Sequence, residues 1–355
     1  MAQITHFFLG ANSGSVWLEL SSAWGAPARA FDLMILKGGP GVGKNTFMRE
    51  IGKTMEQAGA DVEYLWCSGD PDSLDGVAIP AIRCAVCDGT SPHIVEPKYP
   101  AAVDRYVDLG RFYDLPAAKA QAAEVKRHTH DYQDAYARAY RCLKAARQVE
   151  LDTAAEIRQC FDSQRAARRI SGIMARELRG RGTGTGRITR RFLGSVTHKG
   201  PVWRFDSAET LCSKIYELED SYEQAGGLLS ALCAEAVRRS YDVIACPSPE
   251  EPERLEHLLI PELGVAFVTS KPGMEYPGKP YRRVRLNALS HPESKARLRF
   301  RSRMAGVLRE EGVTALQDAK AAHDRLESVY NPYVDFEGVR AQAAIEAGRL
   351  LSWLN

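Results

Sequence analysis

A glycine-rich run at residues 38–46 holds the residue types best suited to chemistry in this chain. It reads Gly38-Gly39-Pro40-Gly41-Val42-Gly43-Lys44-Asn45-Thr46, which matches the Gly-x-x-x-x-Gly-Lys pattern of a phosphate-binding loop. In such a loop, backbone N–H groups and the start of the next helix point at phosphate oxygens, and the lysine reaches the β- and γ-phosphates. The run therefore predicts a site for ATP or another nucleoside triphosphate, formed by residues 38–46 and centred on Lys44.

The segments on either side of this run support the prediction. Residues Phe31–Leu36 are a short apolar run typical of a buried parallel strand, and residues 45–57 carry apolar side chains at helical spacing. Strand, glycine-rich turn and helix is the order that a phosphate-binding loop requires. The alternative is a glycine-rich turn that precedes a lysine by chance.

Asn45 departs from the pattern, because the residue after the lysine is normally a Ser or Thr whose hydroxyl ligates Mg²⁺. Its amide oxygen could still approach the metal, so we assign Asn45 as a metal ligand together with Asp88. Thr46 is a poor substitute, since the next residue of a helix points about 100° away. Nucleotide binding is therefore expected to tolerate Asn45 better than Mg²⁺-dependent chemistry does.

Asp88 ends an apolar run at residues 82–87, and we predict that it holds the Mg²⁺ shell and acts in catalysis with Lys44. The alternative is an Asx turn that ends the strand. His93 follows shortly afterwards and could touch a substrate, although a lone histidine in a loop is more often only solvated.

Asp70 and Asp72 follow a predicted strand at residues 62–66, at the end of the sheet where ligands of open α/β folds lie. They could orient water or a second substrate. Equally, they could cap a short helix predicted to begin near residue 73.

The chain repeats itself. Phe8-Leu9-Gly10 recurs as Phe192-Leu193-Gly194, and residues 71–80 resemble residues 252–261 at an offset of 181. The matching blocks follow the same order, so we predict a tandem duplication of residues 1 to about 189 and about 190 to 355.

The second copy has lost the phosphate chemistry. The offset puts Ala225 where the first copy has Lys44, and Thr269 where it has Asp88. Acidic side chains that would repel phosphate crowd the same turn: Glu219, Asp220 and Glu223. We therefore expect one nucleotide per chain.

Apolar strands alternate with helical segments in both copies, which predicts an α/β fold of P-loop NTPase type, with parallel sheets flanked by helices. The predicted strands are residues 31–36, 62–66 and 82–87, then 214–218, 241–245 and 263–268. A short helix is predicted between the last two strands of each copy. The two copies are expected to pack as a pseudo-symmetric pair.

A helical segment follows each set of strands. Residues 116–178 predict one helical hairpin, residues 292–309 and 313–330 predict another, and a helix at 339–353 ends the chain. Tyr132, Tyr136 and Tyr140 lie at i, i+4 and i+8 and predict a packing face. The predicted units are a phosphate-loop half at 1–115, a helical segment and Gly/Arg linker at 116–189, a degenerate repeat at 190–287 and C-terminal helices at 288–355.

Arginine is concentrated at residues 158–191, where ten arginines face two acids in a chain with a net charge of +2. This run could be an arginine lid over phosphates, a nucleic-acid contact, or a solvated helix face paired with acids elsewhere. We favour the solvated face, so nucleic acid is a partner that the sequence does not favour.

The composition is that of an ordinary globular protein. The 355 residues are 45% hydrophobic and 26% charged, which suits about two domains. No signal peptide or apolar run approaching 18 residues is seen, so we expect a cytoplasmic protein and no membrane partner. The one close cysteine pair, Cys84 and Cys87, is interpreted as two buried apolar residues.

On these motifs, the chain resembles a family of uncharacterised bacterial P-loop proteins with two tandem NTPase-like halves. The resemblance rests on the loop at 37–46, on Asp88-Gly89-Thr90-Ser91-Pro92-His93 and on Ile260-Pro261-Glu262-Leu263, and it covers most of the chain. The family usually carries a phosphate loop in both halves, with Ser or Thr after the lysine. The chain departs from this at Asn45 and at residues 219–227. The resemblance implies ATPase or nucleotide-kinase-like chemistry with ATP and Mg²⁺.

Three functions fit these observations. The first, which we favour, is an ATP-binding NTPase whose hydrolysis drives a conformational change, acting on a protein partner. The second is a kinase that moves the γ-phosphoryl group to a small-molecule acceptor under a helical lid. The third is a nucleotide-binding scaffold that does not hydrolyse, motivated by Asn45.

Overall fold

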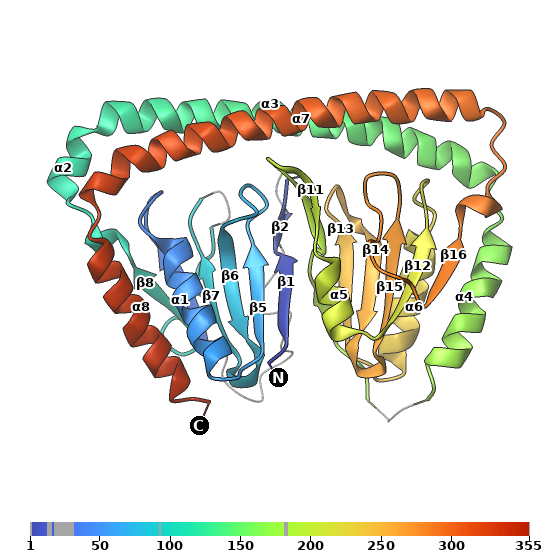
Figure 1. Ribbon diagram of the computed structural model, residues 1–355, viewed down its shortest axis with the longest axis horizontal. Coiled ribbons are helices and arrows are strands. Elements are labelled where there is room, and N and C mark those ends of the chain that lie inside the picture. Colours follow the sequence, from blue (N-terminus) through green and yellow to red (C-terminus); the bar gives the residue numbers. More distant parts are fainter. Residues whose placement is uncertain (1, 13–15, 18–31, 92–93, 181–183, 355) are drawn as a thin grey trace.

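The computed structural model describes residues 2–12, 16–17, 32–91, 94–180 and 184–354. Phe31, His93 and residues 181–183, which enter the predictions above, lie outside the described residues. Figure 1 shows two sheets side by side, with two long helices running across the same end of both.

The first half contains a six-stranded sheet in the order β1-β5-β6-β7-β4-β8. Its strands are β1 (Ile4–Phe8), β4 (Asp32–Lys37), β5 (Val62–Trp66), β6 (Leu74–Ile79), β7 (Cys84–Asp88) and β8 (Asp104–Asp108). Helix α1 (Lys44–Gln57) buries Phe47, Met48 and Ile51 against the sheet. Two short strands, β2 (Gly10–Ala11) and β3 (Val16–Trp17), pair with each other.

The second half has the same strand order, β9-β13-β14-β15-β12-β16, as the tandem duplication predicts. Its strands are β9 (Ile188–Arg190), β12 (Lys214–Glu219), β13 (Val243–Ser248), β14 (Glu251–Ile260), β15 (Val265–Ser270) and β16 (Arg282–Arg285). A hairpin of β10 (Gly194–Thr197) and β11 (Gly200–Trp203) leads into α5 (Phe205–Leu211), and α6 (Gly226–Arg238) corresponds to α1.

The sheets are mixed, which corrects the prediction that they are wholly parallel. β6 runs antiparallel to both of its neighbours, and β14 does the same in the second half, while the other pairs are parallel. The short helix predicted between the last two strands of each copy is therefore wrong. All six residues of β6 are buried, and a segment with no exposed face suits a central strand rather than a surface helix.

The long helices α3 (Ala122–Gln159) and α7 (Lys295–Tyr330) pack against each other across both halves (Figure 1). This corrects the two predicted hairpins, because each long helix pairs with its counterpart from the other copy. Gly312, at the predicted break, lies inside α7. A Cβ there would come within 2.8 Å of the Leu143 side chain of α3, so this glycine permits a close helix contact rather than a turn.

Each half completes the core of the other with its last helix. After α2 (Leu115–Ala120) and α3, helix α4 (Ser163–Glu177) places Ala166, Ile170 and Ile173 in the core of the second sheet. Helix α8 (Phe336–Leu351) places Val339 and Ala343 in the core of the first. The segments 116–189 and 288–355 thus each cover the sheet of the opposite copy.

A shared apolar core joins the two sheets. Phe7 and Phe8 of β1 lie in it with Phe192 and Leu193, which precede β10, and all four are fully buried. Phe8 and Phe192 exchange backbone hydrogen bonds of 2.9 and 3.0 Å. The repeated Phe-Leu motif is therefore where the two halves meet as a pseudo-symmetric pair.

The prediction that Cys84 and Cys87 are buried apolar residues is confirmed in β7. Cys84 and Cys87 are both buried, and they lie in the cores on opposite faces of the sheet. Among the described residues, no helix is both long enough and apolar enough to cross a membrane.

Candidate functional site

The glycine-rich loop joins β4 to α1 at the carboxyl edge of the first sheet. Gly41 and Gly43 adopt φ angles of +72° and +92°, a left-handed conformation that favours glycine, and Gly43 caps the start of α1. Strand, loop and helix therefore follow each other as the sequence predicts, with the N-terminal amides of α1 beside the loop. This is an arrangement that suits an anion.

Lys44 and Asp88 meet at this edge. The Lys44 ammonium donates to the carbonyls of Gly38 (2.9 Å) and Gly39 (3.2 Å), and it lies 3.5 Å from the nearer Asp88 carboxylate oxygen. β4 and β7 are parallel neighbours with Leu36 opposite Asp88, which explains the approach. Asp88 also accepts from the Thr90 N–H and hydroxyl at 2.9 and 2.6 Å. The same carboxylate therefore forms the Asx turn that was the alternative interpretation and lies beside Lys44.

Asp75 is a buried acid that the sequence analysis missed. It lies on β6, next to the strand that carries Asp88, and one of its oxygens has no hydrogen-bond partner among the described residues. Burial, and then the charge of Asp88, raise the pKa of this carboxyl to about 7. The Asp75 carboxyl therefore holds its proton more tightly than an ordinary aspartate does, on the strand beside the one that carries Asp88.

The Asn45 side chain is engaged in a structural role. Its amide oxygen accepts from the Leu74 N–H and from the Arg49 guanidinium, both at 3.1 Å. The oxygen that we assigned to a metal thus joins α1 to the start of β6, and metal binding would have to replace two hydrogen bonds. The side chain of Thr46 is exposed.

Helix α7 of the second half covers the loop. The Gly41 N–H donates to the Glu327 carboxylate at 3.2 Å, and Asn331, with its amide oriented to satisfy both groups, donates to the carbonyls of Gly41 (3.3 Å) and Glu327 (3.1 Å). Tyr113 donates to the Pro40 carbonyl at 2.8 Å. No signal near residues 38–46 could have indicated Glu327 or Asn331, which lie almost 300 residues later in the chain.

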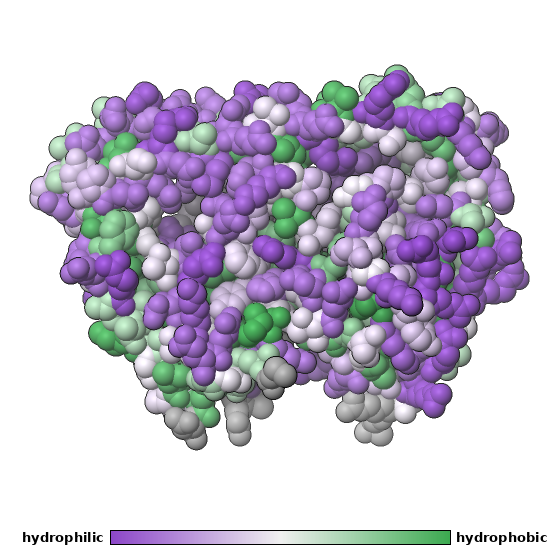
Figure 2. Space-filling model, viewed as in Figure 1, coloured by the Kyte–Doolittle hydropathy of each residue, from purple (hydrophilic) through white to green (hydrophobic). Residues whose placement is uncertain are grey.

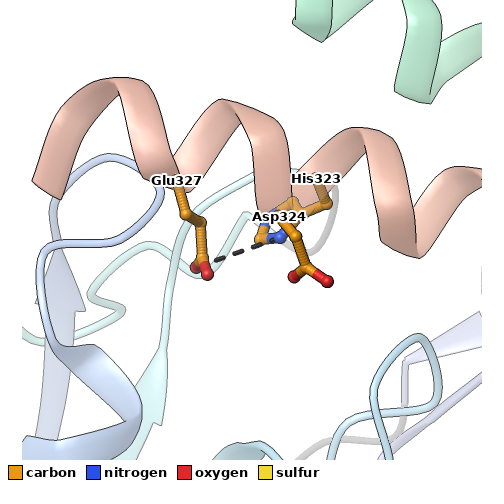
Figure 3. Close-up of side chains that lie close together, drawn as sticks. All are labelled: His323, Asp324 and Glu327. Carbon is orange, nitrogen blue, oxygen red and sulfur yellow. Dashed lines mark ion pairs between the residues drawn. The ribbon is translucent and has the colours of Figure 1, made fainter.

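His323, Asp324 and Glu327 form a cluster on the same side of α7 (Figure 3). One potential ligand atom from each lies within 4.8 Å of the others, and the His323 ring is 3.9 Å from the Glu327 carboxylate. Asp324 is already paired with Lys320 at 2.5 Å. The cluster borders the loop rather than forming a separate centre.

Asp70 and Asp72 shape the turn before β6 instead of capping a helix. Asp70 accepts from the Ser73 hydroxyl at 2.8 Å and lies 3.6 Å from the Lys320 ammonium, while Asp72 pairs with Lys199. Strand β6 lies where the helix that they were expected to cap was predicted. A role of Asp70 or Asp72 in orienting water or a second substrate stays a prediction.

The predicted tyrosine stripe packs between this turn and α7. The hydroxyl of Tyr136 touches the turn so closely that a Cβ on Gly69 would lie 2.3 Å from it. The Tyr132 ring lies 5.9 Å from the His323 ring. The stripe therefore holds α3 over the same edge of the sheet as the loop.

The corresponding turn of the second half contains an internal anion. The Asp220 carboxylate accepts from the N–H groups of Gln224 (2.8 Å) and Ala225 (2.7 Å), directly before α6. Burial raises the pKa of Asp220 to about 6 against the effect of these hydrogen bonds. A carboxylate of the chain itself thus takes the amides that a phosphate would need.

An ion-pair network fills the rest of that turn. Glu223 is buried and lies 2.7 Å from Arg147, 3.2 Å from Lys271 and 3.3 Å from Arg254. Burial alone would raise its pKa, but the three cations outweigh this and lower it to about 2. The acids expected to repel phosphate are therefore neutralised within the protein, and they still leave no cation for a ligand.

The residues of the first loop fit a phosphate group better than those of the second. A Cβ on Gly39 would lie 2.8 Å from the Tyr113 hydroxyl, and one on Gly41 would lie 2.6 Å from the Asn331 amide, so glycine at these positions lets both side chains approach the loop closely. The Gly41 N–H already donates to an anionic partner, the Glu327 carboxylate. For Mg²⁺, the available oxygens are those of Asp88 and the unpartnered oxygen of Asp75, rather than that of Asn45.

No protein-family model, curated protein or solved structure matches this chain.

Proposed function

We propose that the first half binds one nucleoside triphosphate with Mg²⁺ at residues 38–46 and hydrolyses it, and that this changes the position of α7. The observation that carries the proposal is the meeting of Lys44 with Asp88, 3.5 Å apart at the start of α1 beside the glycine-rich loop. A lysine and an acid at these two strand ends are what P-loop nucleotide sites use to hold phosphates and the metal shell.

In the proposed site, each group has a distinct task. Lys44 exchanges its two carbonyl partners for the β- and γ-phosphate oxygens, and the loop N–H groups bind the same phosphates. Asp88 and Asp75 supply oxygens for Mg²⁺, which, when bound, neutralises charge that develops on the transferred phosphoryl group. Asp75 can also hold a proton near neutral pH, since its pKa is raised to about 7.

Glu327 supports the coupling to α7. Its carboxylate occupies the Gly41 N–H, so an arriving phosphate competes with it for the same donor and repels its charge. α7 is a continuous helix of 36 residues that packs along α3 over both sheets (Figure 1). A displacement of its C-terminal end would therefore be carried toward the second half.

A second candidate function is nucleotide binding without turnover. The observation that favours it is the engagement of the Asn45 oxygen with Leu74 and Arg49, which leaves the usual hydroxyl ligand of Mg²⁺ without a replacement.

One titration distinguishes the two candidates. ATP binding is measured by calorimetry with and without Mg²⁺, and phosphate release is measured on the same sample, with a panel of small hydroxyl-bearing acceptors as a third arm. We expect one nucleotide per chain and Mg²⁺-dependent phosphate release. Binding without release in any arm would favour the second candidate, and acceptor-dependent transfer would indicate a kinase.

Lys44→Ala tests the site, with Lys53→Ala as the control. Both lysines belong to α1, but Lys53 is exposed and lies more than two turns further along the helix. Loss of the charged donor should weaken ATP binding at least about 100-fold in Lys44→Ala and leave it unchanged in Lys53→Ala. Equal affinities in the two variants would remove the nucleotide from this loop.

A further inference from the structure

A groove lined with arginine lies at the far end of the second half, between α4 and the edge strand β16. Its volume is about 630 Å³. Figure 2 shows mainly hydrophilic residues over this end of the molecule, on the right in both views. We call it the arginine groove and define it by Arg168, Arg169, Arg176, Arg282, Arg283 and Arg285.

Positive charge exceeds negative charge in the arginine groove. Arg176 pairs with Glu177 at 3.1 Å, and Arg283 pairs with Glu217 at 2.6 Å. Arg285 lies 3.8 Å from Glu219, which Arg283 also approaches. Three carboxylates therefore serve these arginines, and one of them, Glu177, also pairs with Lys214.

Arg168, Arg169 and Arg282 carry the unneutralised charge. All three are exposed, and no carboxylate of the described ranges lies within ion-pair distance of any of them. Arg169 donates to the Arg285 carbonyl at 3.4 Å. Arg168 and Arg282 stand on opposite walls, one on α4 and one on β16, so a ligand lying in the groove could contact both.

The first half provides an internal comparison, because the same two elements there carry matched arginines. Arg105 on β8 corresponds to Arg282, since Met34 pairs with Arg105 as Tyr216 pairs with Arg282. Arg349 corresponds to Arg176, since each lies 14 residues after an Asp that caps its helix (335 to 349 and 162 to 176).

Two acids neutralise the arginines of the first half. Glu346 pairs with Arg105 at 2.5 Å and Arg349 at 3.0 Å, and Asp32 pairs with Arg349 at 2.8 Å. In the second half the position of Glu346, 11 residues after the helix cap, is Ile173, and the position of Asp32, the first residue of its strand, is Lys214. Both arginines are kept while both acids are lost, and Glu177 compensates only Arg176, so the charge of Arg282 points to an anion from outside the chain.

We propose that the arginine groove binds single-stranded nucleic acid through its phosphodiester backbone. Guanidinium groups bind phosphate through paired N–H donors and also stack on bases. Tyr281, at the start of β16, is 56% exposed and lies beside the groove, 5.3 Å from the ring of Tyr216, whose hydroxyl is bonded to Arg176. An exposed aromatic ring beside a basic groove is the pairing that single-strand sites use.

The groove between α4 and β16 favours single-stranded nucleic acid over a duplex or a membrane surface. A single strand can place both its phosphates and its unstacked bases in a groove of about 630 Å³, whereas a duplex keeps its bases paired inside. A membrane surface selects basic residues that project beside apolar ones, whereas these arginines line a concavity between two elements. The shared backbone chemistry does not separate RNA from DNA, so both are tested.

The test is fluorescence anisotropy on the full chain with labelled 20-nucleotide oligo(U) and oligo(dT), at several salt concentrations. Arg168→Ala/Arg282→Ala should weaken binding at least about tenfold, and the loss of two phosphate contacts should reduce the dependence of log affinity on log salt by about 1.4. Tyr281→Ala should weaken binding several-fold through lost stacking. The matched control is Lys119→Ala/Arg340→Ala, which removes the same charge from exposed positions on α2 and α8 at the opposite end.

Several outcomes would overturn the proposal. These are absence of oligonucleotide binding at low salt, an equal loss in the control variant, tighter binding to a 20-base-pair duplex, and retention on phosphatidylserine vesicles without oligonucleotide binding. Thermal melting of each variant shows whether it is folded. Because Arg168 and Arg282 are exposed and have no ion pair within the described ranges, the Arg168→Ala/Arg282→Ala variant should melt like the wild type. Lys44→Ala should bind the oligonucleotide normally, so failure of the nucleotide site leaves this test intact.

Discussion

The starts of α1 and α6 occupy equivalent places, and each has a carboxylate partner, but the two carboxylates come from different parts of the chain. At α6, the Asp220 carboxylate of the same turn accepts from Gln224 and Ala225 at 2.8 and 2.7 Å. At α1, the loop N–H of Gly41 meets a carboxylate only at 3.2 Å, and that carboxylate, Glu327, comes from a helix of the other copy. The second half has a built-in anion, whereas the first has one from another helix, which we propose that a phosphate displaces.

The acids on the neighbouring antiparallel strands show the same contrast. Asp75 and Glu256 are equivalent, since Gly76 pairs with Cys87 as His257 pairs with Val268. The pKa of Asp75 is raised, chiefly by burial and then by Asp88, whereas the pKa of Glu256 is lowered because Lys271 and Arg254 outweigh the effect of its burial. Cations of the chain balance Glu223 and Glu256 in the second half, whereas Asp88 and Asp75 in the first half share one lysine, Lys44. The predictions below test this difference.

The largest effect is expected from Arg254→Ala in the second half. Arg254 lies 3.0 Å from Glu256 and 3.3 Å from Glu223, both buried carboxylates. Removing one partner of a buried pair leaves a charge without compensation, so we expect the free energy of unfolding to fall by about 3–5 kcal/mol. Urea unfolding at pH 7 measures it.

Arg238→Ala is the matched control for this change. Arg238 pairs with Glu235 at 2.7 Å on the exposed side of α6, and such surface pairs contribute little to stability. If Arg254→Ala is no more destabilising than Arg238→Ala, the network is not what stabilises the second turn.

The second largest effect is expected in the pH dependence of the free energy of unfolding when Asp75 is replaced in Asp75→Asn. With a folded pKa of about 7 against an ordinary value of 3.8, Asp75 keeps its proton in the folded chain after the unfolded chain has lost it. Its contribution to stability is therefore fully present below about pH 4 and is lost as the pH rises through about 7. Relative to Asp75→Asn, the wild type should lose roughly 1–3 kcal/mol of unfolding free energy between pH 4 and pH 8.

Glu256→Gln, at the equivalent position of the second half, should change stability with the opposite pH dependence. Because the pKa of Glu256 is lowered, its contribution is present above about pH 4.5 and is lost as the pH falls through the folded pKa. The cost of Glu256→Gln should thus be larger at pH 8 than at low pH. Parallel pH profiles for the two variants would contradict the electrostatic contrast between the halves.

Local signals in the sequence were sufficient to place the loop, Lys44 and Asp88. The strand at Asp32–Lys37, the helix at Lys44–Gln57 and the approach of Asp88 to Lys44 all follow from short segments whose apolar pattern and glycines have one good arrangement. The repeat placed Thr269 opposite Leu218 as Asp88 lies opposite Leu36, because these strands are almost equally far apart along the chain in the two copies.

The features that escaped prediction depend on contacts between distant segments. β6 has no exposed residue, so it shows no alternation from which its direction could be read. Gly312 resembles a helix break until Leu143 of α3 is placed beside it. The exchange of α4 and α8 and the contact of Glu327 with Gly41 cross between the copies, and a pattern within one copy carries no information about them.

A smaller effect is expected from Asn45→Ser. Serine restores a hydroxyl where P-loop sites ligate Mg²⁺, but it gives up the hydrogen bonds that Asn45 makes with Leu74 and Arg49. We expect the Mg²⁺-dependent part of ATP affinity to tighten by about tenfold, with increased phosphate release. Thr46→Ser keeps an exposed hydroxyl one position further on and should change neither quantity. Identical Mg²⁺ dependence in wild type and Asn45→Ser would mean that position 45 takes no part in metal binding.

The smallest effect is expected from Glu327→Gln, and it tests whether the anion at α1 is exchangeable. The glutamine side chain carries no charge, yet its amide oxygen can still accept from the Gly41 N–H, so the fold of the loop should be unchanged. The triphosphate would no longer displace a like charge, and a repulsion of about 1 kcal/mol at a half-buried site corresponds to roughly fivefold tighter ATP binding. Calorimetry at low and moderate salt measures the gain, which should shrink as salt screens the charge.

Glu337→Gln is the control, since Glu337 is an exposed acid in the first turn of α8 and has no described contact with the loop. It removes the same charge from the same end of the molecule, so it shows how much of the gain is a general effect of net charge. If Glu327→Gln weakens ATP binding instead, the carboxylate assists the ligand rather than competing with it. The contact between α7 and the loop would then belong to the nucleotide-bound state, and the comparison between the two turns would reverse, with both of them requiring an acid of the chain.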